Sequence, residues 1–137
     1  MSRIYDLKEK LSSRAYIGIF ILRIFVSLRL LYGVIDNIVS WERMLEFSGF
    51  LHINGFPFPV ISAILSVYIQ AIGGLLILIG YHIRLASLVL VINFIIAALV
   101  HIRLGDSIEA MTPALAILFC CLAFIFMGSG KLSISKP

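Results

Sequence analysis

The chain has 137 residues, of which 61% are hydrophobic and 13% are charged. A soluble domain averages about 45–50% apolar and about 25% charged residues, so this composition excludes an ordinary soluble domain. It predicts one multi-spanning membrane domain over residues 1–137, surrounded by the lipid bilayer. The formal net charge of +4 fits the positive-inside bias of membrane proteins, and we expect no nucleic-acid partner.

The N-terminal stretch MSRIYDLKEKLSSR predicts a helix that rests in the membrane interface. Ile4, Leu7 and Leu11 share one helical face, and the cationic side chains lie off that face. The first membrane span follows at about residues 16–34. A helix is expected here because every backbone amide in lipid needs a partner within its own segment.

The loop SWERMLEFSGFLHINGFPFP predicts a second surface-lying helix. Five of its residues come near helical spacing on one face: Trp41, Met44, Leu45, Ser48 and Leu51. The Asn54-Gly55 pair then turns the chain, and Pro57 and Pro59 precede the second span.

Three further spans are predicted at about residues 60–80, 85–102 and 111–127, each near the roughly 20 residues that cross a bilayer. The turn YHIR between the second and third spans is tight, so these two helices should be antiparallel neighbours. Cys120 and Cys121 stand side by side in the last span and are interpreted as buried packing residues. The predicted fold is thus an all-α integral membrane protein, a four-helix transmembrane bundle with interfacial helices at the N-terminus and in the first loop.

The cationic residues outside the spans are distributed unevenly between the two sides of the predicted bundle. The side with both termini has Arg3, Lys8, Lys10, Arg14, Arg84, Lys131 and Lys136, and the other side has Arg43 and Arg103. The positive-inside rule therefore predicts that both termini are cytoplasmic.

Charged and amide side chains occur where hydrocarbon is expected. Each charge there costs roughly 2.5 kcal/mol or more on insertion scales. At 1.5 Å per residue, Arg23 lies about 12 Å, Gln70 about 16 Å and Asn93 about 13 Å from the inner end of its span. We predict that these three side chains approach one another in an inner polar layer.

An outer layer follows from the same count, with Arg29 at about 21 Å, Ser66 at about 22 Å and His101 at about 25 Å. Asp36 and Glu109 would form its acidic rim. Because of its depth, Arg29 is expected to face the bundle interior. Arg29, Tyr32, Gly33 and Asp36 share one face of the first span, and Arg23 points about 120° away.

Structural interpretations of the same residues stay open. Arg23 would then snorkel to the headgroups, and Gln70 and Asn93 would only hold helices together. His101 would be a hydrogen-bonded structural residue. A single histidine without a second ligand at suitable spacing predicts no metal site.

Five stretches, taken in order, match one family pattern. LRIFVSLRLLYG places Arg23 ten residues before Gly33, GFPFP precedes the second span, and GGLLILIGYHIRLAS leads to Arg84. HIRLGDSIEA contains His101 and Glu109, and GSGKLSIS has the family's closing signature at Gly128, Gly130, Lys131 and Ser133. Together they resemble the DoxX family of small four-span bacterial membrane proteins. The chain departs from the family where Gln70 stands in place of a frequent Glu, which leaves Arg23 without a carboxylate there.

The resemblance implies a multi-pass protein of the bacterial inner membrane. One branch of the family resembles the membrane subunit of thiosulfate:quinone oxidoreductase, and other members are linked to thiol-stress complexes. We therefore predict a membrane subunit of a quinone-, thiol- or sulfur-linked redox system. Its expected small-ligand site comprises Arg23, Arg29, Gln70, Asn93 and His101, and no residue is assigned a catalytic role.

No flavin, haem or iron–sulfur ligand set occurs in the sequence, so quinone is the expected cofactor and none is intrinsic. Electrons would come from a partner protein or from the quinone itself. A partner protein or a homo-oligomer is expected. The alternative functions are a non-enzymatic membrane scaffold or assembly factor and a small-solute carrier, and whether the protein is an enzyme stays open.

Overall fold

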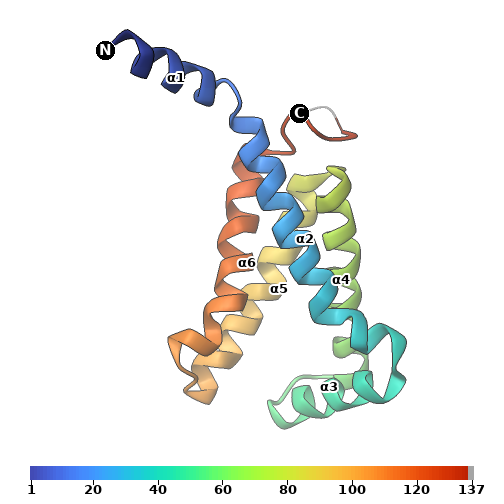
Figure 1. Cartoon of the computed structure of the whole chain (residues 1–137). Coiled ribbons are helices and arrows are strands. Elements are labelled where there is room, and N and C mark those ends of the chain that lie inside the picture. The colour runs from blue at the N-terminus through green and yellow to red at the C-terminus, as the bar shows by residue number, and fades with distance from the viewer. Residues whose placement is uncertain (136–137) are drawn as a thin grey trace.

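The computed structural model describes residues 1–135, and this part of the chain forms six helices (Figure 1). They are α1 (Ser2–Ser12), α2 (Ala15–Val39), α3 (Trp41–Ile53), α4 (Pro59–Ile79), α5 (Ile83–Leu104) and α6 (Ile108–Met127). Helices α2, α4, α5 and α6 are long and apolar enough to cross a membrane. The predicted all-helical bundle with four transmembrane helices is therefore confirmed.

The first span is longer than predicted, because α2 continues five residues beyond residue 34. Asp36 and Asn37 are polar but do not break a helix, and α2 ends only where Ser40 takes an extended conformation (φ −127°, ψ 113°). The other three spans differ from their predicted limits by at most three residues at either end. For example, Ser107 accepts a hydrogen bond from the amide of Ala110 and so starts α6 at Ile108.

Helix α1 and the segment that follows α6 lie at the same end of the bundle, and α3 lies across the opposite end (Figure 1). We call these the terminal end and the α3 end. Helix α4 contacts α2, α3 and α5, and α5 contacts α6. The predicted antiparallel pairing of the second and third spans is confirmed: only Gly80, Tyr81 and His82 separate α4 from α5.

Two clusters of buried side chains form the core. The larger one joins α2, α4, α5 and α6 and includes Val26, Leu30, Ile77, Leu90 and Phe124. The smaller one lies at the α3 end and includes Val34, Met44, Leu51, Ala63 and Val67. The second cluster holds α3 against α2 and α4, which positions the wall of the pocket described below.

The predicted helix in the first loop is confirmed as α3. Met44, Ser48 and Leu51 are buried, whereas Trp41 and Leu45 on the same predicted face stay exposed. The helix ends at the predicted turn, where Gly55 has a φ of +78° and the amide of Phe56 donates to the carbonyl of Leu51. This pairing is the Schellman arrangement, in which a residue of positive φ reverses the chain.

The predicted N-terminal helix is confirmed as α1, and none of its residues is buried. Its location in a membrane interface stays a prediction. Cys121 is fully buried and Cys120 half-buried, and both are free thiols, as expected for packing residues of α6. Lys136, one of the seven cations counted on the side of the termini, lies outside the described residues.

Candidate functional site

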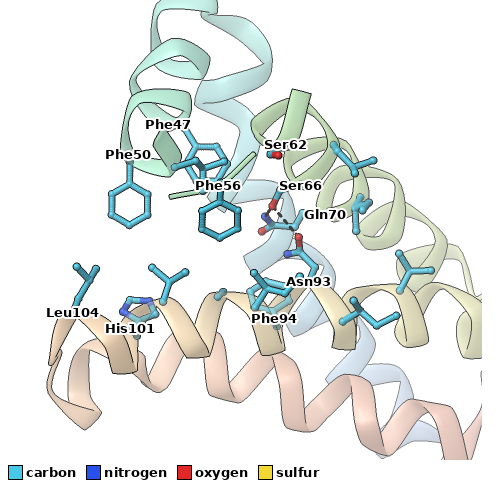
Figure 2. A pocket seen from close by; sticks show the side chains of 18 of the residues that line it. Phe47, Phe50, Phe56, Ser62, Ser66, Gln70, Asn93, Phe94, His101 and Leu104 are labelled. Atoms are coloured by element: carbon cyan, nitrogen blue, oxygen red, sulfur yellow. Dashed lines mark hydrogen bonds between the residues drawn. The ribbon is translucent and has the colours of Figure 1, made fainter. Parts of the chain in front are cut away.

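A pocket of about 580 Å³ lies between α3, α4 and α5 (Figure 2). Its walls are mostly apolar: Phe47, Phe50 and Leu51 come from α3, Phe56 from the following loop, and Ile92, Val100 and Leu104 from α5. Polar groups are few and grouped. They are Ser62, Ser66 and Gln70 on α4, Asn93 and His101 on α5, and Asp106 after it. A mainly apolar cavity of this size with a few polar groups is the usual form of a small-molecule site.

The polar wall of the pocket is a hydrogen-bond chain between α4 and α5. Ser66 Oγ donates to Asn93 Oδ1 at 2.8 Å, and Gln70 Nε2 donates to Ser66 Oγ at 3.3 Å (Figure 2). Within residues 1–135, Asn93 Nδ2 and Gln70 Oε1 have no hydrogen-bond partner. The wall therefore offers one free donor group and one free acceptor.

The separation into an inner and an outer polar layer is wrong for this wall, because Ser66 of the predicted outer layer contacts Asn93 of the inner one. The reason lies in the helix ends. Counted from Ile79 at the end of α4 and Ile83 at the start of α5, the two residues differ in height by only about 4–5 Å. Serine and asparagine side chains bridge that difference.

His101 and Asp106 are hydrogen-bonded to each other on the wall of the same pocket. His101 Nδ1 lies 2.6 Å from Asp106 Oδ2. Gly105, with a φ of +72°, ends α5 and lets the chain fold back, so that Asp106 reaches the preceding turn. We did not predict Asp106 as a site residue. The pattern of a histidine followed by Gly-Asp just past a helix end is the sequence feature that identifies it. Within residues 1–135, no group of three or more potential metal ligands occurs.

Arg23 is not part of this pocket, and the prediction that it approaches Gln70 and Asn93 is wrong. Its side chain is only 1% exposed and all its hydrogen bonds go to backbone carbonyls at the terminal end. Nε donates to Ile77 at 2.9 Å, and Nη2 donates to Leu78 at 2.8 Å. Nη1 donates to Ser129 at 3.0 Å and also to Leu132.

These contacts explain how the fold tolerates a buried arginine. Ile77 and Leu78 belong to the last turn of α4, whose carbonyls lack donors within the helix and form the negative end of its dipole. The segment after α6 lies against the same turn, since the amide of Ile134 donates to the carbonyl of Ile79 at 3.2 Å. Arg23 thus joins α2, α4 and the C-terminal segment. Arg23 is therefore a structural residue and not part of the ligand site.

Arg29 does not face the bundle interior as predicted, because its side chain is exposed on the outer surface of α2. Asp36 and Glu109, the predicted acidic rim, are exposed as well, and neither lines the pocket. The predicted relative directions on α2 are confirmed, since Arg23 is buried while Arg29, Tyr32, Gly33 and Asp36 are exposed. Of the five predicted ligand residues, the pocket brings together Gln70, Asn93 and His101.

Four apolar spans around a core of packed helices define a multi-pass membrane protein. The DoxX family model matches residues 18–102, more than half of the chain, and the chain belongs to the DoxX family. The matched region contains the α4 and α5 residues of the polar wall, together with His101. No curated protein and no solved structure matches the chain.

Proposed function

We propose that this protein is a membrane subunit of a redox system and that its pocket binds a quinone. The observation that supports this most is the pairing of aromatic walls with one free amide donor at Asn93. A quinone is a flat apolar ring with carbonyl oxygens at opposite ends. Phe47 and Phe56 offer faces for the ring, and Asn93 Nδ2 is a donor for one carbonyl.

The second carbonyl has a matching group at the other end of the pocket. Asn93 and His101 are eight residues apart on α5, which is about 12 Å along the helix, so a ring with two terminal carbonyls fits between them. Asp106 pairs with Nδ1 and so orients the imidazole, which leaves Nε2 for a ligand. His101 is then placed to pass protons to the reduced ring.

The proposed redox step is a two-electron reduction of the quinone by a dithiol of a partner protein. The dithiol becomes a disulfide and gives up two electrons and two protons, and the quinone takes up two of each to become a quinol. The chain's own thiols, Cys120 and Cys121, belong to α6, and neither lines the pocket. The proposed reductant is therefore the thiol pair of the partner.

We expect Asn93→Leu to weaken quinone binding by about tenfold or more, because the substitution removes the free donor and leaves a carbonyl unpaired in an apolar pocket. The measurement is equilibrium binding of a benzoquinone with one prenyl unit to the protein in lipid nanodiscs. Ser27→Ala is a control, since Ser27 is a buried polar residue of α2 whose hydroxyl has no partner among the described residues.

The redox part of the proposal has its own measurement. Wild-type nanodiscs should accelerate reduction of the same quinone by dithiothreitol over empty nanodiscs, and Asn93→Leu should abolish the acceleration. Equal binding by wild type and Asn93→Leu contradicts the quinone site. Binding without acceleration contradicts the redox step, and no binding by the wild type favours the scaffold or carrier alternative.

We further propose a bacterial inner-membrane location with both termini cytoplasmic, supported by the excess of cations at the terminal end. A membrane-impermeant maleimide added to intact spheroplasts should label Glu42→Cys and leave Lys10→Cys unlabelled until the membrane is opened. Both positions are exposed, and on opposite ends of the bundle. The reverse pattern of labelling would overturn this orientation.

A further inference from the structure

The outer face of α2 is covered by no other helix within residues 1–135. Six residues follow one another at alternating spacings of four and three: Gly18, Leu22, Phe25, Arg29, Tyr32 and Asp36. All six are exposed, and Tyr32 is 77% exposed although it lies within a membrane span. Residues at spacings of four and three form one stripe along a helix, so these six side chains share one uncovered surface.

Exposure of this face to lipid alone would be unfavourable because it includes the charged side chain of Arg29. It lies about 15 Å from the C-terminal end of α2, and among the described residues it has no hydrogen bond or ion pair. A guanidinium keeps its charge in proteins, and an unpaired charge in hydrocarbon is costly. The positive charge of Arg29 therefore requires a counter-ion from another molecule.

The position of the Arg29 side chain shows where that counter-ion would be. Its Nη1 lies 3.3 Å from the place that a Cβ on Gly33 would occupy, so the side chain runs along the helix toward the α3 end. The Gly33 level is still about 9 Å below the end of α2 at Val39. A carboxylate within the span, close to Gly33, meets this requirement better than a headgroup at the membrane surface.

We propose that α2 packs against α2 of a second copy of this chain. All copies insert in the same direction, so the two helices run parallel around a two-fold axis along the membrane normal. Asp36 lies only about 4.5 Å above Gly33, and its side chain leans back toward the helix N-terminus. Each Arg29 then faces Asp36 of the other copy.

The remaining residues of the face fit this arrangement. Gly33 lies between the two charged positions and lets the helices approach closely, as small residues do in membrane helix pairs. Gly18, Leu22 and Phe25 extend the contact toward the terminal end. The face is separate from the pocket between α3, α4 and α5, so the dimer leaves that pocket free, and the inference does not depend on quinone binding.

The test is association of donor- and acceptor-labelled protein in phosphatidylcholine–phosphatidylglycerol vesicles, followed by energy transfer at several protein-to-lipid ratios. The wild type should form dimers. Arg29→Glu and Asp36→Arg, each alone, should weaken dimerisation by about 30-fold or more, since both place like charges opposite one another in a desolvated contact. The double variant Arg29→Glu/Asp36→Arg should restore it.

The most specific experiment mixes Arg29→Glu protein with Asp36→Arg protein. A copy with Arg29→Glu has two acidic groups on this face, and a copy with Asp36→Arg has two basic groups. They should form a mixed dimer although neither associates with itself. An equal melting temperature of both variants and the wild type in detergent, where the copies are dispersed, confirms that the fold is intact.

Three results would overturn the proposal. The first is a wild type that stays monomeric at every protein-to-lipid ratio. The second is dimerisation that neither single variant weakens, and the third is a mixture of the two that fails to associate.

Discussion

Arg23→Leu is expected to lower the free energy of unfolding by about 3–5 kcal/mol, because several backbone carbonyls lose a charged hydrogen-bond donor. The substitution leaves the carbonyls of Leu78, Ser129 and Leu132 without their guanidinium donor, and each unpaired group costs about 1–3 kcal/mol. The carbonyl of Ile77 still accepts from the amide of Gly80. It also removes the cation from the negative end of the α4 dipole. The measurement is chemical or thermal unfolding of the purified protein in detergent.

Two variants separate this effect from a general loss of charge. Arg23→Lys keeps a cation with three donors but not the planar fork that reaches several carbonyls, so an intermediate loss is expected. Arg3→Leu removes an arginine from α1, where no residue is buried, and should leave the melting temperature unchanged. An Arg23→Leu protein as stable as the wild type would show that the carbonyl cluster does not depend on this side chain.

The second large effect is expected for Gly80→Ala, with a loss of about 2–4 kcal/mol. Gly80 has a φ of +76°, and a Cβ there would lie 2.6 Å from Arg23 Nη2 and still closer to the side chain of Ser133. The left-handed conformation alone costs about 1 kcal/mol for alanine. The clash adds about 1–3 kcal/mol more, as overpacking does, and should detach the C-terminal segment from α4.

Gly105→Ala is the matched control for this prediction. Gly105 has nearly the same backbone conformation, with a φ of +72°, but nothing lies within 4 Å of the position that a Cβ would occupy there. It should therefore lose only about 1 kcal/mol. Faster proteolysis after Met127 in Gly80→Ala, but not in Gly105→Ala, would report the detached segment. Equal losses in both variants would show that only backbone conformation matters at Gly80.

Sequence reasoning predicted the helices well because their determinants are local. A run of about 20 apolar residues forms a helix in lipid whatever surrounds it, and α2, α4, α5 and α6 follow that rule. Gly55 and Gly80 end helices through their own conformational freedom. The face of α2 shared by Arg29 and Asp36 likewise follows from helix periodicity alone.

The contacts of the polar residues could not be predicted in this way. The choice of carbonyls at the end of α4 as the partners of Arg23 depends on a segment more than a hundred residues later in the chain. Every residue has a backbone carbonyl, so no sequence pattern marks the carbonyls that accept from Arg23. Side-chain identity alone therefore predicted Gln70 and Asn93 as its partners. Depth counting also failed for Ser66 and Asn93, because errors at the end of α4 and at the start of α5 add up to about 4.5 Å, half of the predicted height difference of about 9 Å.

By itself, therefore, the sequence determined that the protein is a bundle of four membrane helices, and which faces of those helices are polar. Only the tertiary structure decided which polar groups meet. Arg23 became part of the framework, Gln70, Asn93 and His101 became the wall of one pocket, and Arg29 was left on the outside. The physical reason is that helix formation depends on neighbours along the chain, whereas the partner of a buried charge depends on how whole helices are shifted and rotated against one another.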